Sequence, residues 1–144
     1  MTELVQRQGK TPIFGNLERN LRRFRDDLLN DSARILREEH VASIRQRWYD
    51  TGKSLGSFTE EIVEQGDRKT FLRSSSYAIA LFGEYGTGRR GAASGGPPPR
   101  GYVYGESKGM AARRYSRLAV AAARPRVEQL GRERLRVFGP KALT

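Results

Sequence analysis

The feature that most constrains the fold of this chain is its shortage of large apolar side chains. Leu, Ile, Val and Phe together number 31 of 144 residues. That fraction lies just above the level at which chains fail to bury enough apolar surface to fold. We therefore expect a single domain over residues 1–144 with a thin core, marginally stable as a lone monomer. Contacts between subunits are a common remedy, because a partner that binds only the folded form stabilises it.

Positive charge is concentrated in the C-terminal part of the chain. The formal net charge is +11; residues 1–88 hold 14 Lys and Arg against 13 Asp and Glu, whereas residues 89–144 hold 13 against 3. Most of these C-terminal bases are Arg, whose planar guanidinium suits recognition of phosphate or carboxylate. The charge predicts a polyanionic partner, either nucleic acid or an acidic protein surface, with a merely soluble surface as the alternative.

The chain contains no cysteine, which excludes disulfides and thiolate zinc sites. This absence favours an intracellular or virion protein over a small secreted scaffold. Residues 1–10 are polar and lack the apolar stretch of a signal peptide. No apolar run approaches the length of about 18 residues that a membrane span needs, so we expect no membrane partner.

The N-terminal third has a helical pattern. Residues 1–15 predict an extended arm or one weak strand, and Asn16 is the expected N-cap of a helix. Over residues 16–49 apolar side chains recur at spacings of three and four, which predicts a long amphipathic helix. Asn30-Asp31-Ser32 interrupts the pattern, so either one helix bends there or two helices meet. Asp50-Thr51-Gly52 ends the helix, with the glycine available for a positive φ.

A sheet region is expected over residues 57–85. Residues 57–64 and 69–73 resemble two short strands, and the four residues from Gln65 to Arg68 form a glycine-containing loop between them. Residues 77–85 form a short apolar run, and periodicity leaves open whether this run is a strand or a helix.

Residues 86–109 have a different composition. Gly supplies eight of these 24 residues, and three consecutive prolines stand at 97–99, which predicts a long extended loop. Loops of this length in compact domains are usually functional or disordered. Residues 110–138 return to a helical composition, in which Pro125 must start a helix or kink one.

The residue patterns argue against catalysis and against a metal or cofactor site. The single histidine, His40, has no second His or Cys to complete a metal site. Residues 86–91 match the dinucleotide-binding pattern G-x-G-x-x-G, but the prolines that follow predict that no helix begins there to hold a phosphate. Two matches to the hydrolase pattern G-x-S-x-G, around Ser54 and Ser107, follow the only histidine, whereas that triad runs serine, acid, histidine. We expect a protein that is not an enzyme and uses no cofactor.

The arginines of the C-terminal part are the main candidates for contacts with a partner. At helical spacing Arg113 and Arg117 would share a face. Such side chains neutralise phosphates without reading sequence. Tyr102 and Tyr104 would stack on bases or, preferably, pack on a neighbouring subunit. The candidates for contacts with DNA in a channel or with another subunit are Arg89, Arg90, Arg100, Arg113, Arg114 and Arg117.

Three short motifs follow one another along residues 16–138. The first is a long helix ending in Asp-Thr-Gly, followed by a leucine and a serine before a strand. The second is Tyr-Ala and then Glu, an aromatic residue, Gly and Thr. The third is the Ala-rich stretch 119–123, followed by Arg124-Pro125 and a final helix. The first two motifs comprise Asp50, Thr51, Gly52, Leu55, Tyr77, Glu84, Gly86, Thr87 and Gly88. Glycines can adopt conformations closed to other residues and threonines bond locally to the backbone, so these motifs are interpreted as structural.

With these motifs the chain resembles the gene-ten-like tail-component family of siphophages, also called tail-completion or neck proteins. The resemblance implies an α+β fold, with a long N-terminal helix and a C-terminal helix packed on a small, mostly antiparallel sheet. It also implies a homo-oligomeric ring of six subunits at the head–tail junction of the virion, made in the host cytoplasm. Its expected partners are head-closure or connector proteins, tail terminator or tail tube proteins, and non-specific DNA in a central channel. The alternative is a free-standing basic nucleic-acid-binding protein that uses residues 89–126.

Overall fold

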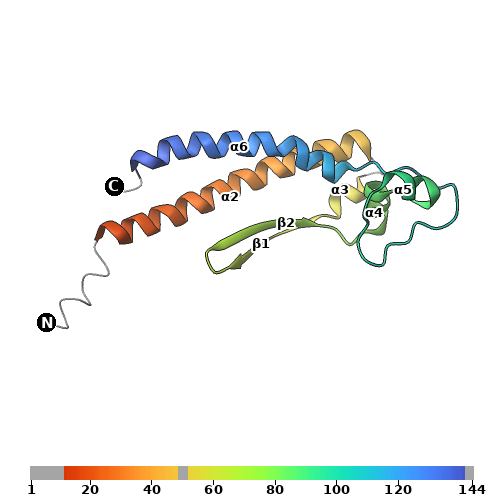
Figure 1. Cartoon of the computed structure of the whole chain (residues 1–144), viewed down its shortest axis with the longest axis horizontal. Helices are drawn as coiled ribbons and strands as arrows, with labels where there is room; N and C mark the ends of the chain where they lie inside the picture. Colours follow the sequence, from red (N-terminus) through yellow and green to blue (C-terminus); the bar gives the residue numbers. More distant parts are fainter. Residues whose placement is uncertain (1–11, 49–51, 142–144) are drawn as a thin grey trace.

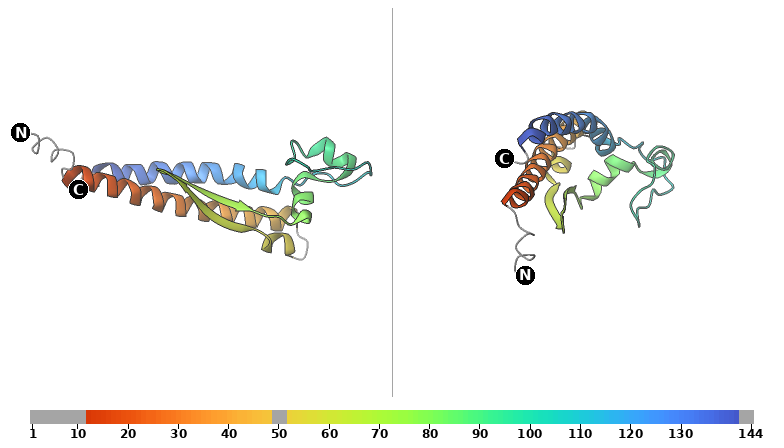
Figure 2. Two further views of the ribbon diagram at one scale, coloured as in Figure 1. Left: turned by 90° about the horizontal axis from the view of Figure 1, so that it is seen from below. Right: turned by 60° about the vertical axis from the view of Figure 1, so that its left-hand side comes forward.

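The computed structural model describes residues 12–48 and 52–141. Two long helices, α2 (Pro12–Arg47) and α6 (Tyr115–Lys141), run antiparallel along the molecule, and a β-hairpin lies beside α2 (Figure 1). Three short helices gather at the end where α2 finishes and α6 begins (Figure 2). The predicted α+β class is confirmed. The remaining elements are β1 (Thr59–Gln65), β2 (Arg68–Ser74), α3 (Lys53–Gly56), α4 (Ala78–Tyr85) and α5 (Gly88–Ser94).

Helix α2 begins earlier than predicted and is continuous. The expected arm over residues 1–15 is wrong for its last four residues, because the helix begins at Pro12 rather than after Asn16. Proline suits a first helical turn, since its φ is fixed near the helical value and its missing N–H would have no partner there. Residues 1–11 lie outside the described part of the chain. Asn30-Asp31-Ser32 does not interrupt the helix, and the Asp31 carboxylate accepts a hydrogen bond from Arg134 of α6.

The hairpin lies where it was predicted, with a tighter turn. β1 and β2 pair antiparallel, from Thr59 opposite Ser74 to Gln65 opposite Arg68, so the turn comprises Gly66 and Asp67 rather than four residues. Gly66 has a φ of +59°, which matches the twist of the flanking strands in a two-residue turn.

Ion pairs fasten one face of the hairpin to α2. Arg37 of α2 donates two hydrogen bonds of 2.6 Å to the Glu60 carboxylate, and Arg73 of β2 lies 2.5 Å from the same carboxylate. Nearer the turn, Lys69 lies 2.9 Å from Asp26. Because side chains alternate along a strand, the neighbours of these residues face away from α2.

The segment between the hairpin and α6 is more helical than predicted. Residues 78–85 form α4, so the sheet region ends at Ser74 rather than at residue 85. The extended loop predicted for residues 86–109 contains helix α5, and an antiparallel bridge between Thr87 and Met110 closes its base. The predicted helical region 110–138 becomes α6, which begins at Tyr115 and runs through Pro125 to Lys141. Pro125 therefore lies inside the helix and leaves the Ala121 carbonyl without its usual backbone donor.

The core is thin, as the composition predicts. The buried apolar residues of the described chain are mostly small: Ala33, Ile35, Ile44, Ala80, Tyr115, Ala119 and Ala123. The alanines allow α2 and α6 to approach closely, and Arg126 of α6 adds ion pairs with Glu38 at 3.1 Å and Glu39 at 2.6 Å. Pairs as exposed as these contribute little each. Several large apolar side chains remain exposed, among them Ile62, Leu72, Val103, Val120, Leu135 and Val137.

Candidate functional site

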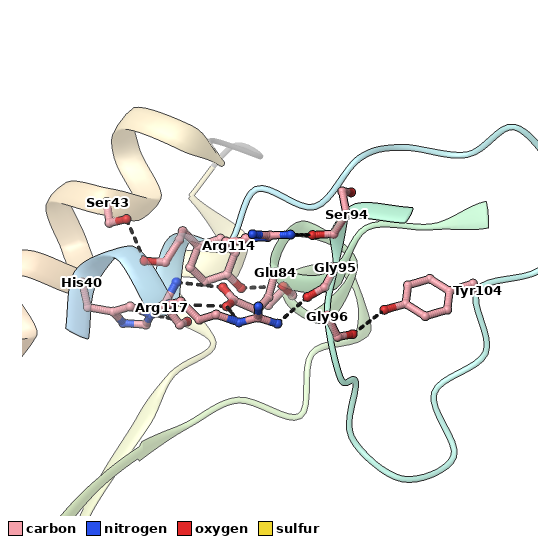
Figure 3. A network of polar contacts seen from close by, with 12 residues as sticks. His40, Ser43, Glu84, Ser94, Gly95, Gly96, Tyr104, Arg114 and Arg117 are labelled. Carbon is pink, nitrogen blue, oxygen red and sulfur yellow. Dashed lines mark hydrogen bonds and ion pairs between the residues drawn. The ribbon is translucent and has the colours of Figure 1, made fainter. Parts of the chain in front are cut away.

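A buried carboxylate holds the start of α6. Glu84, near the end of α4, is 6% exposed, and its Oε2 accepts a hydrogen bond of 2.7 Å from the Ser116 backbone N–H (Figure 3). Its Oε1 accepts a longer bond of 3.4 Å from the Arg117 N–H. These amides belong to the first turn of α6, which has no intrahelical acceptor and carries partial positive charge. Glu84 therefore acts as an N-cap supplied from another helix.

The chain enters α6 across the end of α4. The backbone N–H of Arg113 donates to the Gly83 carbonyl at 2.8 Å, and that of Arg114 donates to the Glu84 carbonyl at 3.2 Å. The last carbonyls of α4 thus gain the donors that a helix end lacks. Arg114 has a φ of +52°, which is unfavourable for a side chain with a Cβ. The backbone bonds on both sides hold it in this conformation.

Glycines allow α4, α5 and residues 107–112 to meet. Gly86 has a φ of +78°, and a Cβ there would lie 2.5 Å from the Met110 carbonyl oxygen. At Gly88, with a φ of +59°, a Cβ would lie 2.4 Å from the Ser107 carbonyl oxygen. Thr87 between them pairs with Met110 in both directions, at 2.8 and 2.9 Å, and its hydroxyl accepts from the Met110 N–H at 3.1 Å. The motif residues Glu84, Gly86, Thr87 and Gly88 therefore form one structural junction.

Two of the predicted contact arginines are used inside the subunit. The Arg114 guanidinium donates to the Ser94 carbonyl, and that of Arg117 donates to the Gly95 carbonyl (Figure 3). Tyr104 adds a hydroxyl bond of 3.0 Å to the Gly96 carbonyl. The prediction that Arg113 and Arg117 share a helical face is wrong, because α6 begins at Tyr115 and Arg113 precedes it.

The other candidate arginines are more available. Arg89 donates from Nε to the Glu106 carbonyl at 3.1 Å and is otherwise exposed. Arg90, Arg100 and Arg113 are exposed, and their guanidinium groups make no hydrogen bond or ion pair within the described residues. These three arginines are therefore available for contacts outside the subunit near the α4–α5 end of the molecule.

The first motif supports the turn after α2. Asp50 and Thr51 lie outside the described residues, but Gly52 has the expected positive φ, +82°. Leu55 is half-buried in α3. Tyr77, from the second motif, immediately precedes α4, and its backbone N–H donates to the Ser75 hydroxyl at 3.1 Å. The indole N–H of Trp48 donates to the Ser54 hydroxyl at 3.2 Å.

A tryptophan ring packs against α4 next to the junction. A Cβ added at Gly83 would lie 2.6 Å from atoms of the Trp48 ring, so no larger side chain fits there without movement. The sequence motifs do not include this contact.

Sequence reasoning also missed a polar chain from the hairpin to α6. Arg73 donates from Nε to His40 Nδ1 at 2.9 Å, and His40 Nε2 lies 3.0 Å from the Ser116 hydroxyl. Burial and the charge of Arg73 lower the pKa of His40 from 6.5 to about 4. Because Nδ1 accepts from an arginine, the ring proton sits on Nε2 and points at the serine. A general base must present a lone pair to its nucleophile, so this pair does not activate Ser116.

The expectation about the G-x-G-x-x-G match is corrected in one respect. A helix, α5, does begin at Gly88, although the prolines were expected to prevent it. The backbone N–H groups in the first turn of α5 already have acceptors within the chain. Those of Gly88, Arg89 and Arg90 donate to the carbonyls of Tyr104, Ser107 and Lys108, respectively. The element before it is a helix rather than a strand, so the arrangement differs from a dinucleotide site.

The described residues contain no cluster of three or more potential metal ligands. Within the same part of the chain, no helix combines the length and apolarity needed to cross a membrane. Comparisons of the chain with protein-family models, with curated proteins and with solved structures find no match.

Proposed function

We propose that this chain is a structural subunit of the neck of a long-tailed DNA phage. Copies of it would form a ring that joins the head connector to the tail and surrounds the DNA channel. The observation that carries the proposal is the meeting of the motif residues at one junction. Glu84, Gly86, Thr87 and Gly88 fix α4, α5 and α6 relative to one another through internal bonds. Residues with this role serve the shape of a subunit rather than a reaction.

Apolar side chains left in solvent support assembly. Val137 is 59% exposed, Leu135 is 56% exposed and Ile62 is 52% exposed, while the buried core consists largely of alanine. A protein with so little internal apolar burial gains stability when neighbours cover these side chains. Ring formation is therefore consistent with the energetics of the subunit.

The free arginines support a weak contact with duplex DNA. Arg90, Arg100 and Arg113 are available at one end of the molecule, whereas Arg114 and Arg117 bond to backbone carbonyls. Three available arginines at this end would give a shallow, sequence-independent attraction, which allows DNA to pass through a channel.

The alternative, a free-standing nucleic-acid-binding protein using residues 89–126, has less support. Arg126 pairs with Glu38 and Glu39, so four arginines of this segment make contacts within the chain: Arg89, Arg114, Arg117 and Arg126. A monomer that bound duplex tightly, with an affinity falling steeply as salt rises, would favour this alternative.

The decisive experiment is to image phage particles that carry a tagged copy of this chain. The proposal expects a ring of the protein at the head–tail junction, and particles lacking the protein should have heads and tails that do not join. Finding the protein outside the virion, or obtaining normal infectious particles without it, would overturn the proposal.

A further inference from the structure

The hairpin presents two free edges of opposite charge. Within the described residues the sheet contains β1 and β2 alone, so each strand is paired on one side. The charged residues of β1 are the acids Glu60, Glu61 and Glu64, and those of β2 are the bases Arg68, Lys69 and Arg73. We propose that the β1 edge of one copy of the chain adds to the β2 edge of a second copy. This inference rests on the proposed assembly into a ring and names the surface that makes the contact.

The backbone of both edges is available for this pairing. In a hairpin closed by a two-residue turn, the residues that flank the turn exchange both backbone bonds, and such pairs alternate along the ladder. Gln65 with Arg68 is therefore a bonded pair, as is every second pair after it. The residues between them, including Ile62 on β1 and Phe71 on β2, direct N–H and C=O outward. An unpaired row of this kind is a template for another strand.

The free edge of β2 borders an apolar groove. The groove has a volume of about 430 Å³ and lies between residues 69–71 of β2, α2 and α6. Leu29 and Leu36 line it from α2, and Val120 and Val127 line it from α6. Val120 is 48% exposed, so a strand laid along β2 would remove apolar surface from water as well as gain backbone bonds.

The β1 strand of a second copy fits this edge in both polarity and charge. Its centre is Ile62-Val63, flanked by glutamates, whereas the centre of β2 is Phe71-Leu72, flanked by bases. Glu61 and Arg68 are exposed, and neither makes an ion pair within the described chain. Apolar residues of one strand can therefore meet apolar residues of the other, and free acids can meet free bases.

The contact is heterologous, because it joins two different surfaces of the same chain. Each subunit keeps one β1 edge and one β2 edge to offer, so the contact propagates from copy to copy and closes only if the rotation allows a ring. A contact of β1 with a second β1 would instead place acids opposite acids.

The first test places a lysine on the β1 edge. Ile62→Lys puts a charge where another strand must pair, a device that natural edge strands use to prevent addition. The matched control is Val103→Lys, which also replaces a β-branched apolar side chain by lysine, at an exposed residue away from the hairpin. Sedimentation equilibrium of the full chains should show the self-association Kd of Ile62→Lys raised by about tenfold or more, with the control near the wild type. Equal association of both variants, or a wild-type chain that stays monomeric, would refute the proposal.

The second test reverses one charge on each edge. Glu61→Arg and Arg68→Glu should each weaken self-association by about fivefold, because each places like charges at the contact. Mixing the two variants should restore association, since each then offers the charge that the other lacks. Circular dichroism verifies that every variant is folded. Failure of the mixture to associate more tightly than either variant alone would contradict edge pairing.

The outcomes separate this inference from the proposed function. A phage neck ring that forms normally with Ile62→Lys refutes the hairpin contact and leaves the neck assignment intact. Hairpin-dependent association of a protein that is missing from the virion supports the contact and refutes the neck assignment.

Discussion

At the scale of single residues, Glu84 is the side chain on which the junction depends most. The buried Glu84 carboxylate accepts hydrogen bonds from two backbone N–H groups of α6. The backbone carbonyl of Glu84 accepts a third, from Arg114 in the segment that leads into that helix. A charged acceptor at a helix N-terminus makes stronger bonds than a neutral one.

Replacing Glu84 by Gln should therefore destabilise the protein. Gln keeps the shape, but it loses the charge and turns an NH₂ group toward one of the amides. We expect the free energy of unfolding, measured by urea denaturation, to fall by about 2 kcal/mol. Glu106→Gln makes the same chemical change at an exposed residue and should alter the free energy by less than about 0.5 kcal/mol. Equal losses in both variants would argue against the capping role.

His40 should make stability depend on pH. Its folded-state pKa of about 4 lies below the ordinary 6.5, so between these values the unfolded chain binds a proton that the folded protein does not. Stability from this source is complete above pH 6.5 and falls as the pH drops toward 4. At pH 5 the contribution of His40 to the free energy of unfolding should be lower by about 2 kcal/mol than at neutral pH. The chain has a single histidine, so His40→Gln should flatten the profile between about pH 7 and pH 5. An unchanged slope in that variant would assign the dependence to other groups.

At the scale of elements, α5 and residues 95–110 are held by side chains of the α6 start. Arg117 donates to the Gly95 carbonyl, and its guanidinium lies 5.9 Å from the centre of the Tyr85 ring. The Tyr104 hydroxyl donates to the Gly96 carbonyl, and the Thr87 hydroxyl accepts from the Met110 N–H. These hydrogen bonds hold the segment in place on the rest of the subunit.

Removing the Arg117 guanidinium should loosen this segment without unfolding the protein. We expect Arg117→Ala to speed amide hydrogen exchange over residues 88–109 by about tenfold, with little change in α2. Arg113→Ala removes a nearby arginine that makes no side-chain bond in the described chain and should leave exchange unchanged. If residues 88–109 exchange at the same rate in the wild type and in both variants, Arg117 does not hold the segment.

The elements divide into those that local pattern predicts and those that it does not. The long stripe of α2 and the paired strands around Gly66 follow from periodicity and turn chemistry, which act over a few residues. Helix α4 was ambiguous because a short apolar run satisfies either periodicity. Helix α5 was missed because its Gly-rich sequence has no apolar stripe, and bonds from residues 104–110 support it.

The same distinction applies to the junction. Gly86 and Thr87 were predicted to be structural because glycine and threonine chemistry suggests turns. Arg73 and Ser116 were not predicted, since Ser116 lies 76 positions from its partner His40 along the chain. No local pattern encodes a contact at that separation.

At the scale of the whole molecule, the shape is a long helix pair with a hairpin along one side and a compact cluster of short helices at one end (Figure 2). The buried apolar residues are few, and much of the large apolar surface faces solvent. A molecule of this kind should depend on neighbours for part of its stability.

Thermal stability should therefore rise with protein concentration. If assembly stabilises the fold, a tenfold increase in concentration should raise Tm by roughly 3 °C, measured by circular dichroism. Ile62→Lys should show a smaller dependence if the hairpin edge makes the contact. A Tm that stays constant over about a hundredfold range would show that the lone subunit is self-sufficient.

The contact between the Trp48 ring and Gly83 gives the protein an intrinsic fluorescent probe. The chain has one tryptophan, and its ring touches the helix that carries Glu84. Indole emission depends on the polarity around the ring, so any event that moves α4 away from Trp48 should shift the emission spectrum. Formation of a ring, or its docking on another component, can thus be followed in unlabelled protein by fluorescence at this single site.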